Sequence, residues 1–232
     1  MKVGFAGNTH LGQTMSAAAR RRGFDVVDDL WICDLVFITL DVEKPEDVKP
    51  VADLCHRLNV NVPEDVPFII QSQVPPGFTR KVNNSIRRPV YYQLDTIIVN
   101  KALERATYPE RFIIGCPSKQ TMLPPLYLDF LLKFGCTVYR MSYESAELAK
   151  QAINTMLAAQ IAAANVLSDI AYRVEADWED VEISLRTDAR IGKTAYVTPG
   201  QIGGHLVRDI RLLDKIAFDD PLFPTLMRFT DD

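Results

Sequence analysis

The sequence has 232 residues, of which 47% are hydrophobic and 24% charged, a composition that supports one large folded domain or two small ones and excludes a disordered chain. Its formal charge of -4 leaves no large positive field for a nucleic-acid backbone. The apolar run "LVFITL" is far shorter than the roughly 20 residues that span a bilayer, and we expect no hydrophobic leader before the first strand. We therefore expect a soluble, cytoplasmic protein that binds neither nucleic acid nor membranes.

Cysteines and histidines are scattered along the chain. The four cysteines include no Cys-x-x-Cys pair, and no histidine lies at metal-ligand spacing from them. We expect no metal site and no disulfide framework, and the thiols are interpreted as small buried hydrophobic groups. His56 falls in a helical stretch and is expected to be structural.

Residues 1–141 alternate between apolar strands and helices. "KVGFA" precedes the helical stretch "QTMSAAARRRG", whose arginines suit the last turn of a helix. The strands "DVVD" and "DLVFITL", the helix "DVKPVADLCHRL" and the strand "PFIIQSQ" follow, and then "RFIIG", a helix near "LPPLYLDFLLKFG", and "CTVYRM". This alternation predicts an α/β fold with a mostly parallel sheet covered on both faces.

A long helix is expected after Ser142, which suits an N-cap, because "ESAELAKQAINTMLAAQIAAANVLSDIAYRVEA" contains neither Gly nor Pro. The stretch "RTDARIGKTAYVTPGQIGGHLVRD" is predicted to be an irregular, functional loop between helices. We expect one domain over residues 1–141 and a helical dimerisation segment over residues 142–232. The alanine-rich helix indicates a homodimer, with an intrachain helix bundle as the alternative.

The first turn, Gly7-Asn8-Thr9-His10-Leu11-Gly12, is similar to a dinucleotide-binding fingerprint with Thr9 in place of the middle glycine. Glycines in a strand, turn and helix unit let the backbone approach a pyrophosphate, which then sits at the helix N-terminus. The strand-first context favours a degenerate nucleotide-binding turn over a purely structural turn.

Asp28 and Asp29 lie about 20 residues beyond the turn, where an acidic residue usually binds the ribose hydroxyls. No arginine follows them to receive a 2′-phosphate, which favours NAD over NADP; the alternative is a solvated turn. Only residues 30–33 separate "VVDD" from "DLVFITL", too few for a helical crossover. The adenosine side of the pocket should lack its outer wall, so NAD is expected to bind weakly or not at all. Leu40, which ends "DLVFITL", completes the predicted cofactor contacts.

Lys150 and Asn154 lie four residues apart in the long helix and therefore share one face. A lysine whose pKa is lowered by burial can exchange a proton with an alcohol or a carbonyl, and an asparagine can orient the substrate oxygen. Spacing alone favours an ordinary polar stripe.

The chain resembles the UDP-glucose and GDP-mannose dehydrogenase family in its N-terminal and central dimerisation regions. The segments that carry the resemblance include "KVGFAGNTHLG", "SQVPPGFTRKV", "ELAKQAINTMLAAQIAAANVLSDIA", "DARIG" and "PGQIGGHLVRD", in the family's order. The resemblance implies a truncated Rossmann-like domain, a long helix and a small helical segment, with NAD as cofactor and a nucleotide sugar as substrate. It also implies catalytic roles for Lys150, Asn154 and Asp209, and the family's third domain is expected to be missing.

The active site is expected to be degenerate relative to this family, whose members oxidise an alcohol twice through an aldehyde held on a cysteine. Alignment on Asp209 places His205 at the position of that cysteine, and alignment on "GGH" places Leu206 there. Neither side chain is a thiol, so the covalent intermediate of the second oxidation cannot form. His205 is then expected to be a polar residue of the pocket.

The family's two acidic residues fall near Asp95 and Val99, and Gln73 stands where the family has a threonine. Three hypotheses follow. In the first, the chain is a two-electron, NAD-dependent oxidoreductase in which Asp209 fixes Lys150 or a water, similar to the β-hydroxyacid dehydrogenases. In the second, it is a catalytically inactive relative that binds a nucleotide or a partner chain. In the third, it is one part of a split dehydrogenase.

Overall fold

The computed structural model describes residues 1–42, 44, 47–95, 99–217 and 220–230. Contacts between Cα atoms divide the chain into an N-terminal unit, Met1–Lys150, and a C-terminal unit, Gln151–Asp232. The division falls inside the long helix, later than the expected boundary at residues 141 and 142. The reason is that the first turns of this helix, with Tyr143 and Ala146, belong to a core of the N-terminal unit.

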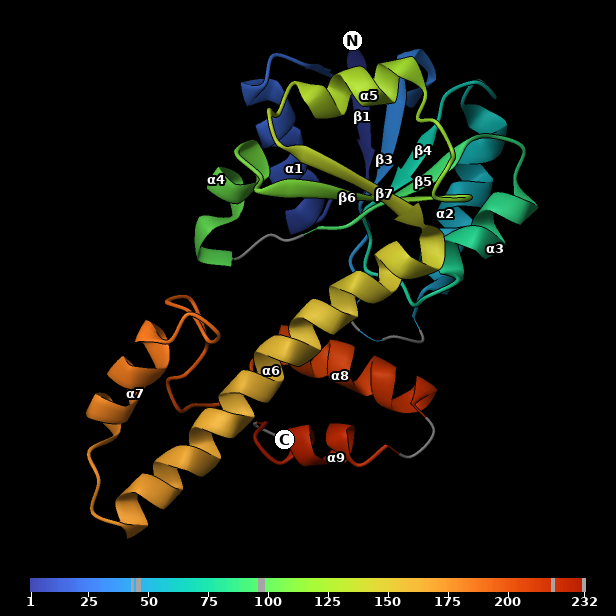
Figure 1. The fold of residues 1–232 in the computed structure, drawn as a ribbon. Helices are drawn as coiled ribbons and strands as arrows, with labels where there is room; N and C mark the ends of the chain where they lie inside the picture. Colours follow the sequence, from blue (N-terminus) through green and yellow to red (C-terminus); the bar gives the residue numbers. More distant parts are fainter. Residues whose placement is uncertain (43, 45–46, 96–98, 218–219, 231–232) are drawn as a thin grey trace. The chain divides into compact units, whose positions relative to one another are not determined.

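The N-terminal unit contains a seven-stranded sheet in the order β2-β1-β3-β4-β5-β6-β7 (Figure 1). All neighbouring strands are parallel except β5 and β6, so the predicted mostly parallel α/β sheet is confirmed. The strands are β1 (Lys2–Ala6), β2 (Asp25–Val26), β3 (Leu35–Ile38), β4 (Phe68–Ile70), β5 (Val90–Gln93), β6 (Arg111–Cys116) and β7 (Thr137–Ser142).

Helices cover both faces of this sheet. Successive residues of a strand point to opposite faces, so in β3 Val36 and Ile38 join one apolar core while Leu35 and Phe37 join the other. The first core includes α2 and α3, and the second includes α1 and α5, whereas α4 packs on α1. The bounds are α1 (His10–Arg21), α2 (Lys49–Asn61), α3 (Phe78–Ser85), α4 (Ala102–Thr107) and α5 (Pro125–Leu132).

A short connection links β2 to β3, as the sequence predicts. Between them lie a few residues and the 3-10 turn η1 (Leu30–Ile32), and β2 is the outermost strand of the sheet beside β1. A second 3-10 turn, η2 (Val99–Lys101), precedes α4. The elements β5, α3 and α4 were not predicted from the sequence.

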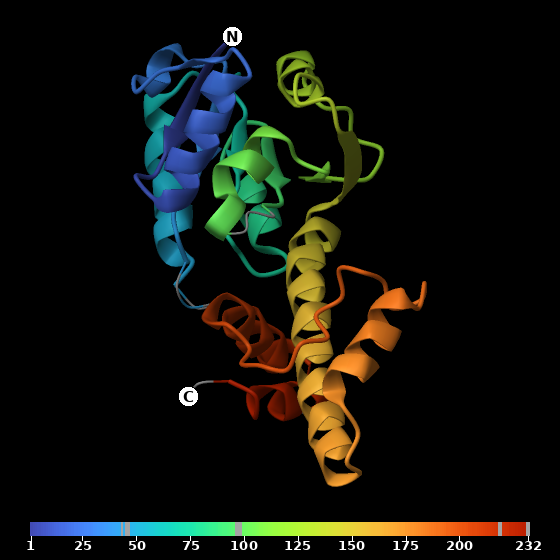
Figure 2. The same cartoon turned by 90° about the vertical axis from the view of Figure 1, so that its left-hand side faces the viewer.

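The helix α6 (Tyr143–Arg173) runs for 31 residues without a break, which confirms the predicted long helix (Figure 2). Ser142 caps it as expected, because its Oγ accepts a hydrogen bond from the Ser145 amide at 3.3 Å. In the C-terminal unit α6 is accompanied by α7 (Trp178–Thr187), α8 (Gly204–Ile216) and α9 (Leu222–Met227). No described helix combines the length and the apolar character that a membrane crossing requires.

The predicted irregular loop, residues 186–209, is shorter in the structure. Its first two residues belong to α7, and α8 already begins at Gly204, so the loop prediction is wrong at both ends. The glycines of the "GGH" segment lie at the helix start, where glycine is tolerated, and Leu206, Val207 and Ile210 supply an apolar face behind them. Asp209 is therefore a helical residue.

Candidate functional site

The turn from Gly7 to Gly12 joins β1 to α1, as a dinucleotide-binding unit requires. A Cβ atom on Gly7, whose φ is 130°, would lie 2.9 Å from the main-chain carbon of Thr39, and one on Gly12 would lie 2.5 Å from the Gly7 carbonyl oxygen. Both glycines are thus required by the packing of the turn against the end of β3, with or without a ligand. The side chains of Asn8 and His10 are exposed.

Thr9 caps α1 with its side chain. Its Oγ1 accepts a hydrogen bond from the Gly12 amide at 3.1 Å and donates one to the Thr39 carbonyl at 2.5 Å. The Thr9 hydroxyl therefore occupies the Gly12 N–H group at the helix N-terminus. In the dinucleotide-binding fingerprint a glycine stands at this position and leaves room for the phosphates. Leu11, the next candidate along the turn, packs in an apolar cluster between α1 and α4.

The two aspartates beyond β2 differ in their local roles. Asp29 caps η1, because its Oδ1 accepts a hydrogen bond from the Trp31 amide at 3.0 Å, and the side chains of both Asp28 and Asp29 are exposed. Leu40 is half-buried directly after β3. In the described sheet β2 is the outermost strand, beside β1.

Lys150 is buried in the N-terminal unit, with 7% of its surface exposed. Its Nζ donates a hydrogen bond to the main-chain oxygen of Asp95, directly beyond β5, at 2.7 Å. A buried ammonium group requires compensating interactions, so Lys150 does not belong to a solvated polar stripe. Asp95 and Val99 are the two positions that the resemblance places near the family's acidic residues. Val99 lies in η2.

In the C-terminal unit, Asn154 and Asp209 form a buried pair. Asn154 is 6% exposed and Asp209 only 2%, and the Asn154 Nδ2 donates to the Asp209 Oδ2 at 2.5 Å. The Nε of Arg208 lies 3.6 Å from the other carboxylate oxygen. The pair fixes the orientation of the Asn154 amide, which leaves its carbonyl oxygen as the group that can bind a donor.

Two glutamines follow β4 at the carboxyl edge of the sheet. The Oε1 atoms of Gln71 and Gln73 are both buried and accept no hydrogen bond from the described residues. Gln71 lines a small pocket together with Gln93, Arg105 and Arg111. Buried acceptors without donors are rare in folded proteins, so these oxygens are available to a donor such as a hydroxyl or amide group.

Sequence reasoning singled out Gln73 but missed Gln71 and Gln93. The available signal was the polar pattern of "QSQ" immediately after a fully buried strand, since strand carboxyl ends of α/β sheets form ligand sites. Gln93 was missed together with its strand, and its Oε1 accepts a hydrogen bond from the Tyr127 hydroxyl at 2.9 Å.

The two alternatives for the family's cysteine position differ in burial. His205 is exposed in the first turn of α8, whereas Leu206 is 3% exposed in the core of the C-terminal unit, with Ile210. A buried leucine side chain offers no polar group to a substrate. Of the two residues, only His205 can present a polar side chain.

The cysteines do not offer a reactive thiolate. Burial raises the pKa of Cys33 to about 11, that of Cys55 to about 12 and that of Cys116 to about 11, and it also raises the pKa of the half-buried Cys136. Thiols with such values remain protonated near neutral pH and are poor nucleophiles. In the described part of the chain no three His, Cys, Asp or Glu side chains are grouped so that they could hold a metal ion.

One protein-family model matches the C-terminal part of the chain. Residues 144–231 match the central domain of the UDP-glucose/GDP-mannose dehydrogenase family. The UDP-glucose 6-dehydrogenase of Rickettsia prowazekii is 26% identical over 196 residues, which cover 79% of this chain and 45% of that protein. The chain is related to the nucleotide-sugar dehydrogenases. The UDP-glucose 6-dehydrogenase of Bacillus subtilis is 25% identical over 213 residues, which cover 79% of this chain and 47% of that protein.

The family resemblance expected from the motifs is thereby confirmed, and it is partial, because the chain spans about half the length of these curated relatives. Solved structures show the same fold at low identity. A UDP-D-ManNAc dehydrogenase from Pyrococcus horikoshii has a TM-score of 0.84 at 17% identity, covering 100% of this chain and 68% of that one. The Mycobacterium tuberculosis 3-hydroxyisobutyrate dehydrogenase has a TM-score of 0.76 at 16% identity, covering 98% of this chain and 91% of that one.

Proposed function

We propose that the chain is an NAD-dependent oxidoreductase that transfers two electrons between the cofactor and a CH–OH group. The observation that carries the proposal is the pair of buried polar arrangements on α6: Lys150 bound to the Asp95 carbonyl and, one helical turn later, Asn154 bound to Asp209. Buried ionisable groups are costly to maintain and gather at sites of proton transfer, which supports a catalytic role over a structural one.

Each residue has a distinct task in this proposal. Lys150 exchanges the hydroxyl proton of the substrate, and Asn154 orients the substrate oxygen with an amide that Asp209 holds in place. Gln73 offers its buried oxygen to a substrate hydroxyl. NAD, when bound, accepts the hydride. A nucleotide sugar is the proposed substrate class, because the curated relatives are UDP-glucose 6-dehydrogenases.

The turn from Gly7 to Gly12 and the aspartates Asp28 and Asp29 would hold the cofactor. The turn has the strand, turn and helix geometry that a dinucleotide requires, and the exposed Asp28 can reach ribose hydroxyls and repel a 2′-phosphate. The Thr9 hydroxyl occupies part of the phosphate position, so we expect NAD to bind weakly and NADP more weakly still.

The stoichiometry of the reaction tests the proposal. Because neither His205 nor Leu206 is a thiol and the pKa values of all four cysteines are raised, an active chain should reduce one NAD per alcohol and release a free carbonyl product. The assay follows NADH absorbance against a panel of nucleotide sugars and small hydroxy acids, before and after thiol alkylation, which should have no effect at the site. Two NAD reduced per substrate, with a carboxylate product, would contradict this mechanism.

A second candidate function is that of a non-catalytic relative that binds a nucleotide or forms dimers. The use of Thr9 as a helix cap and the outermost position of β2 favour it, because both weaken a dinucleotide site. A third candidate is one part of a split dehydrogenase, whose other part is a separate polypeptide. Turnover that requires a second polypeptide would favour the third candidate, and cofactor binding without turnover would favour the second.

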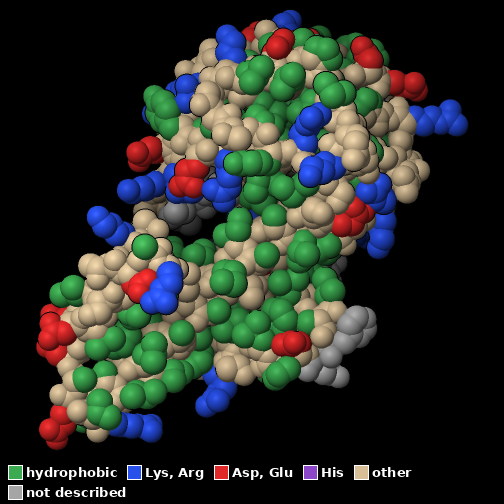
Figure 3. Space-filling model, in the orientation of Figure 1, with side chains coloured by type: hydrophobic (Ala, Val, Ile, Leu, Met, Phe, Trp, Pro, Cys, Tyr) green, Lys and Arg blue, Asp and Glu red, His purple; other side chains and the backbone are tan. Residues whose placement is uncertain are grey.

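We also propose that the chain forms a homodimer through α6. Hydrophobic side chains gather on the visible face of the C-terminal unit along α6 and α7 (Figure 3). On α6, Met156 is 63% exposed, Leu167 44% and Ile170 48%, at spacings that place them along one side of the helix, whereas Ile161 packs in the unit's own core. Exposed apolar helix faces of this kind mark contact surfaces.

The double substitution Met156→Asp with Ile170→Asp should convert the dimer to a monomer, because it buries two carboxylates in the contact. Light scattering after size-exclusion chromatography measures the mass. Leu132→Asp, which introduces the same charge at a 58% exposed position of α5 in the other unit, should leave the dimer intact. If light scattering shows that the unmodified chain is a monomer at working concentration, the proposed homodimer is contradicted.

A further inference from the structure

The Pro-Pro-Gly segment forms a turn that presents two amides to a buried carboxylate. The Phe78 amide donates to the Pro75 carbonyl at 3.1 Å, and Gly77 has a φ of 88°, as glycine does at the third position of a type II turn. The amide of Gly77, within the turn, and the amide of Thr79, just after it, donate to the two carboxylate oxygens of Glu147 at 2.6 and 2.7 Å. Glu147 thereby satisfies N–H groups at the start of α3 that have no partner within the helix.

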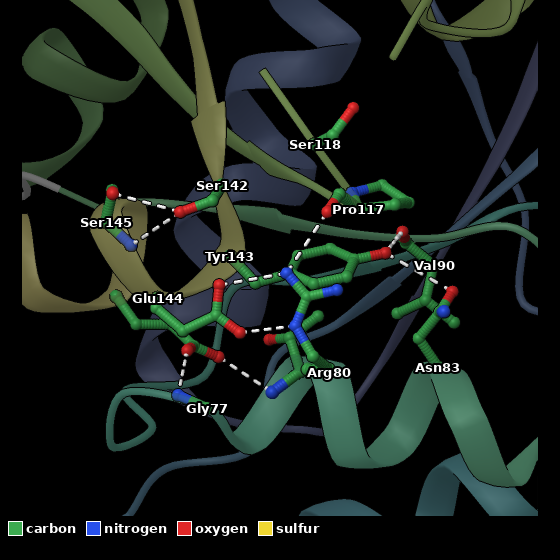
Figure 4. Close-up of polar contacts among 12 residues, drawn as sticks. Gly77, Arg80, Asn83, Val90, Pro117, Ser118, Ser142, Tyr143, Glu144 and Ser145 are labelled. Atoms are coloured by element: carbon green, nitrogen blue, oxygen red, sulfur yellow. Dashed lines mark hydrogen bonds and ion pairs between the residues drawn. The ribbon is translucent and has the colours of Figure 1, made fainter. Parts of the chain in front are cut away.

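Glu147 is fully buried, and burial raises the pKa of its carboxyl group. Its surroundings contain a second, more exposed link between the same elements: Arg80 of α3 forms an ion pair with Glu144 of α6 and donates to the Pro117 carbonyl (Figure 4). The Tyr143 hydroxyl adds a hydrogen bond to the Val90 carbonyl at 2.6 Å. These contacts already attach α6 to α3 and β5. The buried carboxylate of Glu147 is therefore not needed merely to hold α6 against these two elements.

We propose that Glu147 is a positioning residue for the reaction: it fixes the loop that bears Gln73 and the helical turn that bears Lys150. The loop from Gln71 to Gly77 connects β4 to α3, and the bond to the Gly77 amide fixes its far end. Lys150 lies one turn beyond Glu147 on α6, with its Nζ on the Asp95 carbonyl. Glu147 thus couples the carboxyl ends of β4 and β5 through one turn of α6. This inference rests on the proposed function for its catalytic meaning, but its structural content is independent.

The test compares Glu147→Gln with Glu144→Gln. The first keeps the side chain's size but replaces one accepting oxygen with an amide that cannot accept, whereas the second removes the exposed pair with Arg80 and leaves the two amides bound. The readouts are hydrogen exchange of the Gly77 and Thr79 amides and the 15N resonance of the Lys150 ammonium group, both by NMR on the full chain. We expect exchange to rise about tenfold or more and the lysine resonance to move in Glu147→Gln, because a charge-assisted bond is lost, and neither change in Glu144→Gln.

Unchanged exchange in Glu147→Gln would overturn the link between Glu147 and the turn. Faster exchange of the Gly77 and Thr79 amides with an unmoved Lys150 resonance would overturn the positioning role. The bonds from Glu147 to these amides would then be purely structural. If the glutamine variant does not fold, Glu147→Asp, which keeps the charge but is too short to reach both amides, should give the same two changes.

Turnover provides a separate readout. Glu147→Gln should lower kcat for NAD-linked oxidation about tenfold or more with a smaller change in KM, since a misplaced catalytic group slows chemistry more than it weakens binding. An equal loss in Glu144→Gln would contradict the positioning role. Absence of turnover in the unmodified chain would remove the proposed function, while the amide and lysine signals would still decide whether Glu147 couples the two strands.

Discussion

Lys150→Ala is expected to lower the rate of NAD-linked oxidation by about 10²- to 10⁴-fold, the usual contribution of a positioned general acid or base. The affinity for NAD should hardly change, because the Lys150 Nζ binds the Asp95 carbonyl and is assigned to proton transfer and not to the dinucleotide. Initial rates from NADH absorbance, together with a calorimetric titration of NAD, measure the two effects separately.

Lys150→Arg distinguishes proton exchange from charge. Arginine keeps the positive charge and the length of the side chain but does not lose its proton near neutral pH, so this variant should be nearly as slow as the alanine variant. Lys81→Ala, at an exposed position on α3, controls for the loss of a lysine elsewhere and should keep the full rate. An arginine variant as active as the unmodified chain would show that Lys150 does not transfer a proton.

Thr9→Gly is expected to strengthen NAD binding about tenfold or more, because it frees the Gly12 amide to bind a phosphate oxygen through a charge-assisted hydrogen bond. It also removes the side chain from the helix N-terminus, where the fingerprint has a glycine. The same change should lower the free energy of unfolding by about 1–3 kcal/mol, because glycine is tolerated at an N-cap but the hydrogen bond from the Thr9 hydroxyl to the carbonyl of the buried Thr39 is lost.

Thr9→Ser is the matched control, since it retains the capping hydroxyl and removes only a methyl group. Its dissociation constant for NAD should remain close to that of the unmodified chain in the same calorimetric titration. If glycine and serine bind NAD equally, the hydroxyl does not limit access and the turn from Gly7 to Gly12 is not the pyrophosphate site.

Much of the fold is predictable from local patterns. The alternation of apolar strands with helices predicted the mostly parallel sheet, and the absence of Gly and Pro after Ser142 predicted α6. Short elements such as β5 and α4 were missed, because four to six residues do not establish a period. The start of α8 was misplaced because Gly203 and Gly204 are turn signals in sequence, whereas the burial of Leu206 and Ile210 extends the helix back to them.

The sequence suggests candidate residues for the site but not their environment, and their catalytic and binding roles stay predictions. The spacing of Lys150 and Asn154 placed them on one helix face, yet whether that face is solvated depends on tertiary packing, which a single sequence does not report. The buried acceptors of Gln71 and Gln73 likewise depend on neighbours distant in the chain. Thr9 shows the opposite case, since threonine is a common N-cap and its capping role follows from local propensity.

The most direct test of the account is a calorimetric titration of NAD, and separately of NADP, into the unmodified chain. We predict weak binding of NAD and weaker binding of NADP, because Asp28 and Asp29 disfavour a 2′-phosphate and Thr9 restricts the pyrophosphate position. Tighter binding of NADP, or no binding of either dinucleotide at concentrations on the order of millimolar, would contradict the assignment of the chain as an NAD-dependent oxidoreductase.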